Sequence, residues 1–354
     1  MSNATLGRPA ELSTRRIAGI IAIAAAALFV LWGLVAPAST PGRVLRVMFT
    51  KSALSATLRL SVPIAFAALG GIFAEKSGVI NIGLEGLLII SAFVGVYATD
   101  VTGDIWLGLL VGVVASVLLA AVFAVVCIEF RADQIIAGLA VWLIALGLAP
   151  FASQVIYGGP NTTSVQTFGT ITVPGLAGVP FFGALFDASP IVYLMFVATA
   201  ASWYTLNRTS FGRWVIASGE NPQALDTAGV DVNRVRYAAV LISGLLAGIG
   251  GAALSLSLGQ FVGNGQTMVN GKGFIAIVAY LFGNYNPVGA LLSTFLFAGL
   301  DALQLRLQAA AIIAVPQSLV RTIPYIAVIV VLALFGRTRL PEAAGEHYES
   351  GEDR

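Results

Sequence analysis

Long apolar runs recur along almost the whole chain, and they constrain its fold more than any other feature. A helix needs roughly 20 apolar residues to cross the ~30 Å hydrocarbon core of a bilayer. Lipid offers the backbone no hydrogen-bond partner, so helices are expected, whereas a barrel would show short alternating segments. The sequence therefore predicts an all-α, polytopic transmembrane helix bundle of about ten spans. The expected spans are residues 17–36, 53–73, 79–99, 104–127, 134–156, 189–207, 237–258, 265–283, 286–306 and 318–336.

Composition supports a lipid-facing surface. Charged residues make up 10% of the chain and hydrophobic residues 58%, whereas soluble domains carry about a quarter charged residues. With a net charge of +2 and no cluster of Lys and Arg, the chain is not expected to bind nucleic acid.

The positions of Lys and Arg predict that both termini are cytoplasmic, since cytoplasmic segments are enriched in these residues. The predicted outer loop 157–188 contains neither residue, although Arg43, Arg46 and Lys51 argue mildly for the opposite orientation. The basic residues expected inside are Arg8, Arg15, Arg16, Lys76, Arg131, Arg208, Arg213, Arg234, Arg236, Arg337, Arg339 and Arg354.

This orientation divides the chain into three parts. Residues 1–16 form a cytoplasmic N-terminal segment, residues 17–336 the transmembrane domain and residues 337–354 a cytoplasmic tail. The run at 17–36 follows two arginines, as in a secretory signal, but it is longer than a usual signal core. We therefore interpret it as an uncleaved first span.

Polar residues inside apolar segments need a reason, because a charge at the bilayer centre costs about 2.5–3.5 kcal/mol or more. Glu75 and Lys76 are expected at the membrane edge, whereas Asn81 and Glu85 lie deeper and four residues apart, on one helical face. A second interruption, with Asn284 and Asn286, precedes Pro287. Broken helices at matching positions of two halves can mark a transport pathway, and tight turns between antiparallel spans are the alternative.

The predicted inner loop 208–236 contains the pattern of a short helix. Asn221 and Pro222 suit its start, Ala224, Leu225 and Ala228 provide an apolar stripe, and Gly229 ends it. A helix that contacts a partner and a helix that rests on lipid headgroups both remain open.

No catalytic or metal-binding arrangement is recognisable. The single Cys127 lies in an apolar run and the single His347 in a charged tail, so neither a disulfide nor a metal site of these residues is expected. The chain has no phosphate-binding loop, no zinc-protease motif and no nucleophile elbow. We expect neither an enzyme nor a bound cofactor.

Several motifs resemble one family. The run AALGGIFAEKSGVINIGLEGLLIISAF is similar to the signature of ABC importer permeases of the branched-chain amino acid, ribose and nucleoside group. SGENPQALDTAGVDVNRVR, FIAIVAYLFGNYNPVGALLSTFLFAGLDALQ and RTIPYIAVIVVLAL also resemble it, in the same order, over residues 50–336. The sequence GVINIG, where sugar permeases have Gly-Gly-Ile-Asp-Leu-Ser, most resembles the nucleoside and simple-sugar branch. That branch works with a basic membrane lipoprotein.

The resemblance implies a division of labour. The chain would be one permease of a heterodimer in a bacterial cell (inner) membrane, with a cytoplasmic ABC ATPase and an extracytoplasmic substrate-binding lipoprotein, and it would import nucleosides or related small polar solutes. The residues expected to couple it to the ATPase are Gly219, Glu220, Asn221, Pro222, Ala224, Leu225, Asp226, Ala228 and Gly229. The residues expected along the translocation pathway, from their polarity, are Asn81, Glu85, Asn284 and Asn286.

Three alternative functions are compatible with the sequence. The same ABC class could carry simple sugars or branched-chain amino acids. An ion-coupled secondary transporter should have buried ionisable residues in several central spans, and the fourth to eighth predicted spans carry almost none. A scaffold protein without a pathway is the third.

Overall fold

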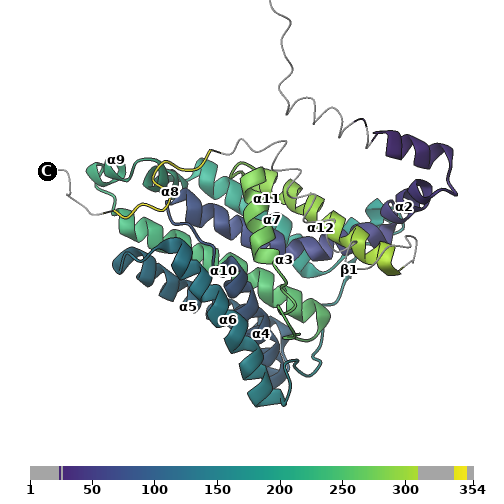
Figure 1. Cartoon of the computed structure of the whole chain (residues 1–354), viewed down its shortest axis with the longest axis horizontal. Helices are drawn as coiled ribbons and strands as arrows, with labels where there is room; N and C mark the ends of the chain where they lie inside the picture. The colour runs from purple at the N-terminus through teal and green to yellow at the C-terminus, as the bar shows by residue number, and fades with distance from the viewer. Residues whose placement is uncertain (1–23, 25–26, 310–338, 349–354) are drawn as a thin grey trace, which may run out of the picture. The chain divides into compact units, whose positions relative to one another are not determined.

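The structure is a computed structural model that describes residue 24 and residues 27–309 and 339–348 (Figure 1). These residues form two compact units. One contains the described residues up to Thr50 together with 303–309, and the other contains Lys51–Ala302 together with 339–348. The second unit contains both helix interruptions and the inner loop predicted from the sequence.

Six helices among the described residues are long and apolar enough to cross a membrane. They match six of the predicted runs, so the all-α fold is confirmed in its coarse form, and the strands found are the two short ones of a hairpin, β1 (Ile171–Thr172) and β2 (Asp187–Ala188). The six are α3 (Lys51–Lys76), α4 (Leu84–Thr102), α5 (Ile105–Ala124) continued by the π-helical turn η1 (Val125–Glu129), α6 (Gln134–Tyr157), α10 (Val232–Leu258) and α12 (Pro287–Ala309).

The other four predicted runs have different outcomes. In the first run, a helix at Ala27–Val35 is joined to α2 (Thr40–Met48) at a bend of 98°, and this pair would make a seventh span. The run 189–207 forms α7 (Pro190–Arg208), which is not among the six. The run 265–283 contains an 11-residue helix, α11 (Lys272–Phe282), which at 1.5 Å per residue covers about half of the hydrocarbon core. The run 318–336 lies outside the described residues.

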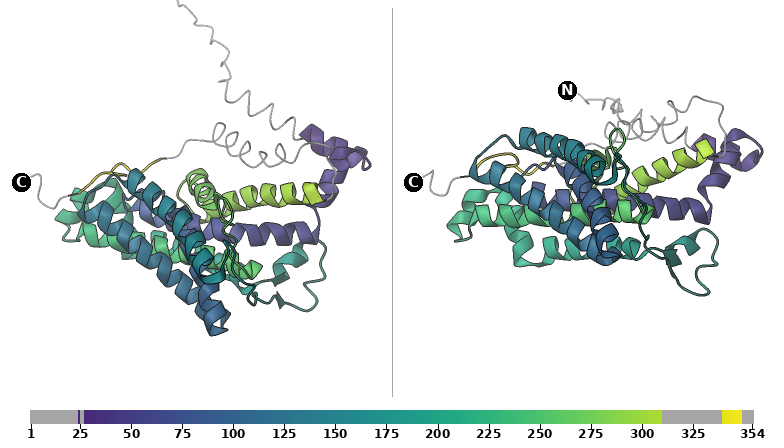
Figure 2. Two further views of the ribbon diagram at one scale, coloured as in Figure 1. Left: turned by 60° about the horizontal axis from the view of Figure 1, so that its bottom comes forward. Right: turned by 90° about the horizontal axis from the view of Figure 1, so that it is seen from below.

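In the unit from Lys51 to Ala302, the central helices are α3, α4 and α10, and α5 packs against α4 and α10 (Figure 2). Within their apolar windows, 78% of α10 is buried by the protein but only 28% of α6. Leu110 and Leu118 of α5 and Leu143 of α6 have exposed side chains. Exposure of apolar side chains to water is unfavourable, so these faces of α5 and α6 suit contact with lipid.

Small residues let the central helices approach closely. A Cβ atom on Gly70 would lie 2.8 Å from the carbonyl oxygen of Ser243, and one on Gly251 would lie 2.2 Å from that of Leu88. Gly244 and Gly248 approach α5 in the same way. Since helix association in lipid depends on close van der Waals packing, these glycines explain how α10 packs against α3, α4 and α5.

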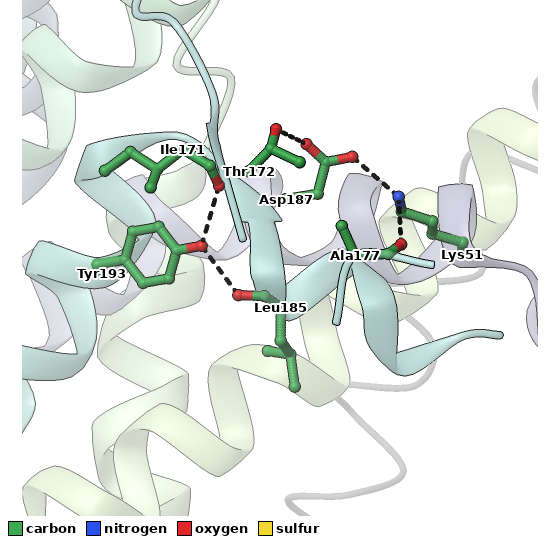
Figure 3. A network of polar contacts seen from close by, with 7 residues as sticks. All are labelled: Lys51, Ile171, Thr172, Ala177, Leu185, Asp187 and Tyr193. Atoms are coloured by element: carbon green, nitrogen blue, oxygen red, sulfur yellow. Dashed lines mark hydrogen bonds and ion pairs between the residues drawn. The ribbon is translucent and has the colours of Figure 1, made fainter. Parts of the chain in front are cut away.

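The loop between α6 and α7 is ordered by polar contacts to the start of α3 (Figure 3). Lys51 Nζ lies 2.9 Å from Asp187 Oδ2 and donates to the carbonyl oxygen of Ala177. Asp187 Oδ1 accepts from Thr172 Oγ1 across the hairpin, and the Tyr193 hydroxyl of α7 donates to the carbonyl oxygen of Leu185. The Lys51 ammonium lowers the pKa of the Asp187 carboxyl below its usual value.

Candidate functional site

Two interruptions of the helical bundle lie close to the positions that the sequence predicts. α3 ends at Lys76 and α4 begins at Leu84, which leaves a first break at residues 77–83. α11 ends at Phe282 and α12 begins at Pro287, which leaves a second break at residues 283–286. Asn284 and Tyr285 have φ angles of 51° and 55°, in the left-handed region that Asn tolerates better than most residues.

The first break is buried, and the predicted pathway residue Asn81 lies within it. Asn81 is 1% exposed, and its Nδ2 donates to Ser243 Oγ of α10 at 3.0 Å. Its Oδ1 has no hydrogen-bond partner among the described residues. α4 begins three residues after Asn81, so the prediction that Asn81 and Glu85 share one helical face is wrong.

Glu85 lies in the first turn of α4, and its carboxylate reaches the start of another helix. It is 2% exposed and accepts from the backbone N–H groups of Gly271 at 2.7 Å and Gly273 at 2.6 Å. The first N–H groups of a helix have no partner within it and favour a negative charge. Glu85 therefore caps α11 from α4, which gives this buried carboxylate a structural role.

Glu75 takes a matching role at the other end of α11, which the sequence did not predict. It is 6% exposed, and it accepts hydrogen bonds from the hydroxyls of Tyr280 and Tyr285, the latter at 2.6 Å. Two tyrosines beside the second break were the available signal, because buried tyrosine hydroxyls usually find a partner. We call Glu75 and Glu85 together the carboxylate clamp: they flank the first break, and each holds one end of α11.

The second break borders a polar cavity of about 110 Å³. Asn284 and Asn286 line it, so two of the four predicted pathway residues come together there, while Asn81 and Glu85 do not line it. The Lys76 ammonium lies 6.0 Å from the centre of the Tyr285 ring at the same place. The remaining lining residues are Leu206, Asn207, Ile216, Tyr285 and Pro287.

The predicted inner loop folds into two helices, α8 (Ser210–Glu220) and the short α9 (Pro222–Thr227). As predicted, Pro222 is the first residue of α9 and Asn221 caps it, with Asn221 Oδ1 accepting from the Ala224 N–H at 2.9 Å. Gly229, at φ 81°, follows the helix.

The residues predicted to couple to a partner separate into two groups. Ala224 and Ala228 are exposed, as are Glu220, Asn221 and Gly229, whereas Leu225 is 4% exposed and anchors the helix. Gly219 is buried at the end of α8, where a Cβ atom would lie 2.4 Å from the carbonyl oxygen of Lys76. Gly219 thus contacts the first break and is not available to a partner.

A helical chain with at least six candidate spans among its described residues is a multi-pass membrane protein. The chain belongs to the family described as the branched-chain amino acid transport system / permease component, which matches residues 53–334. It is therefore a transport component and not an enzyme, and the family resemblance drawn from the sequence motifs is confirmed.

Curated relatives are similar over most of the chain. The nucleoside ABC transporter permease protein NupC of Lactococcus lactis is 36% identical over 81% of this chain and 93% of its own length. The guanosine ABC transporter permease protein NupQ of Bacillus subtilis is 36% identical over 84% of this chain and 96% of its own. The putative glucose ABC transporter permease protein TsgC13 of Haloferax volcanii is 37% identical over 73% and 79%. No solved structure matches the chain.

Proposed function

We propose that this chain is the membrane-spanning subunit of an ATP-driven importer of nucleosides. The similarity to NupC and NupQ, at 36% identity over more than four-fifths of the chain, is the observation that supports this most. The similarity to TsgC13 favours simple sugars as the second candidate substrate. The family resemblance also supports a heterodimer with a second permease, a cytoplasmic ATPase and an extracytoplasmic binding lipoprotein.

The proposed topology has about ten spans with both termini in the cytoplasm of a bacterial cell, the membrane being the inner one. The distribution of Lys and Arg supports this orientation, because the loop 157–188 carries neither residue. The loop instead offers exposed apolar side chains, among them Ile171, Leu176 and Phe182. This composition suits a surface on which the binding protein docks.

The proposed contact with the ATPase is α9. Ala224 of α9 and Ala228 directly after it are exposed and small enough to fit into a partner's groove, and the buried Leu225 fixes the helix to the protein. A short capped helix can transmit a push as a rigid body, which suits the rocking motions of transporters.

The proposed pathway follows the two breaks. Asn284 and Asn286 at the second break already border a polar cavity, and Asn81 at the first break has a carbonyl oxygen free of partners among the described residues. Glu85 would support the pathway by holding α11. Interrupted helices beside a substrate path are common in transporters.

The test of function is uptake of labelled guanosine into proteoliposomes that contain the permease pair, the ATPase and the binding protein. We expect uptake that requires ATP and all components and that excess unlabelled nucleoside, but not glucose, abolishes. Competition by glucose alone would reassign the substrate to sugars. Uptake driven by an ion gradient without ATP would refute the proposal.

The test of topology uses single cysteines. Cys127 is the chain's one cysteine and is buried, so its replacement by Ala gives a blank background. A cysteine at Ala224 should react with a membrane-impermeant maleimide only from the cytoplasmic side, and one at the open position Gly169 only from outside. The reverse pattern would overturn both the orientation and the proposed role of α9.

A further inference from the structure

Residues 339–348, which we call the C-terminal strap, return to the helical unit and run beside α8 and α9 (yellow in Figure 1). The strap has little regular structure, yet Pro341 and Ala343 are buried. The burial shows that this part of the tail is packed against the protein and is not a solvated end.

Backbone hydrogen bonds attach the strap at two places. The N–H of Ala343 donates to the carbonyl oxygen of Gly219 at the end of α8, at 2.8 Å. The N–H of Gly345 donates to the carbonyl oxygen of Gly78 in the first break, at 2.9 Å. Ser218 Oγ donates to the carbonyl oxygen of Ser77 beside them. The strap, the end of α8 and the first break therefore form one continuous contact.

A buried arginine adds a third attachment. Arg236 of α10 is 3% exposed, and its Nη1 donates to the carbonyl oxygen of Glu346 at 2.8 Å. Its Nε and Nη2 have no partner among the described residues. A buried cation with incomplete hydrogen bonding is costly. Loss of the hydrogen bond to the carbonyl oxygen of Glu346 would therefore destabilise the buried Arg236 further.

The fourth attachment reaches α9. The hydroxyl of Tyr348 donates to Asp226 Oδ2 at 2.9 Å. Asp226 lies one residue after the buried anchor Leu225 and on the helix proposed to meet the ATPase. The strap thus joins α9 to the first break and to α10 through residues that are far apart in the sequence.

We propose that Tyr348 and Arg236 are positioning residues that act through the C-terminal strap: they tie α9 to the first break, so that a displacement of α9 by the ATPase moves the bundle. This inference rests on the proposed role of α9. The strap itself transmits the movement and does not recruit the ATPase, because its contacts are directed inward to the protein.

The test compares variants in the complete reconstituted transporter by guanosine uptake, ATP hydrolysis and ATPase co-purification. The main variants are Tyr348→Phe, which removes one hydrogen bond, and a chain that ends at residue 338. We expect the ratio of guanosine imported to ATP hydrolysed to fall roughly two- to tenfold with Tyr348→Phe, the effect of losing one hydrogen bond, and further with the truncation. The ATPase should still co-purify.

Matched variants separate positioning from folding. Asp226→Asn keeps an oxygen that accepts from Tyr348 and should retain coupling, whereas Asp226→Ala should reproduce the loss. His347→Ala changes an exposed neighbour in the strap and should behave as wild type. A pattern in which Tyr348→Phe and Asp226→Ala keep the wild-type import ratio would overturn the inference, as would loss of ATPase co-purification in Tyr348→Phe. If the wild-type transporter itself needs no ATP, the proposed function fails instead.

Discussion

The two helix breaks look alike in sequence but are held very differently. At the first break, Ile80 donates its N–H to Gln134 of α6 at 2.7 Å, and Asn81 donates to Ser243 of α10. Contacts from α8 and the C-terminal strap reach the same seven residues. At the second break, Asn286 Oδ1 accepts from the N–H groups of Val288 and Gly289 in its own helix. The contacts of this break with other parts of the protein are fewer: Tyr285 donates to Glu75 of α3, and Asn284 accepts from the N–H of Arg339 at 3.5 Å.

This difference assigns different mechanical roles to the two breaks. The first break is tied to four separate parts of the protein, so moving it would disrupt contacts with all of them. In the second break, Tyr285 is buried and bound to Glu75, but Asn284 and Asn286 are exposed and border a cavity, so this part of the break can change shape at lower cost. Regions with few buried contacts are the ones that open most readily, which makes the second break the better candidate for a moving part.

The largest expected effect comes from the carboxylate clamp that connects the two breaks. Glu85→Ala leaves two N–H groups at the start of α11 without their acceptor. Because hydrogen bonds to charged groups contribute about 1.5–3 kcal/mol each, we expect the free energy of unfolding to fall by about 3 kcal/mol or more. Thermal unfolding in detergent measures it. Glu85→Gln, which keeps one oxygen, should lose less stability. Wild-type stability in Glu85→Ala would show that Glu85 does not hold α11.

A close approach of backbones tests how tightly the first break is held. A Cβ on Gly219 would lie 2.4 Å from the carbonyl oxygen of Lys76 and 3.0 Å from the N of Gly78. Gly219→Ala should therefore destabilise the protein by about 1–3 kcal/mol, the usual cost of overpacking.

Gly147 of α6, which has open space around it, provides the matched control. Gly147→Ala should be neutral or slightly stabilising, because Ala favours helices more than Gly. Equal unfolding temperatures for the two alanine variants would show that α8 does not hold the first break.

The tyrosine end of the clamp should contribute less. Tyr280→Phe and Tyr285→Phe each remove one hydroxyl from Glu75 while leaving the other in place. We expect a loss of about 1–2 kcal/mol in unfolding free energy for each. The double variant should lose more than the sum of the two, because Glu75 would then be buried without a donor. Simple additivity would argue that Glu75 finds another partner.

The smallest effect is expected at the second break. Asn284 has a φ of 51°, a conformation that glycine adopts without strain. Asn284→Gly should change the unfolding free energy by less than about 0.5 kcal/mol, as most exposed substitutions do, whereas Asn284→Ala should cost about 1 kcal/mol through backbone strain. If Asn284→Gly destabilises as much as Gly219→Ala, the contrast between the two breaks fails.

The sequence predicted the local features well. Glycine and asparagine mark both breaks, Pro287 follows the second, and Asn221 with Pro222 starts α9 as expected. Apolar residues made the predicted start of one helix wrong. Val79, Ile80 and Ile82 resemble the start of a span, yet α4 begins at Leu84. The glycine-rich segment before Lys272 likewise shortens the predicted span to α11.

The long-range contacts could not be predicted in the same way. Glu85 and Gly271 are 186 residues apart, and Glu75 and Tyr280 are 205 apart. Periodicity and capping rules describe neighbours in sequence and carry no information about such pairs. The polarity of Glu85 predicted a pathway residue. Its geometry shows a carboxylate that caps the start of α11.

Hydrogen–deuterium exchange of the assembled transporter, with and without ATP, tests the central contrast most directly. We predict that ATP changes exchange at residues 283–286 and leaves residues 77–83 protected in both states. A change at 77–83 with none at 283–286 would contradict it, because the firmly held break would then be the one that moves.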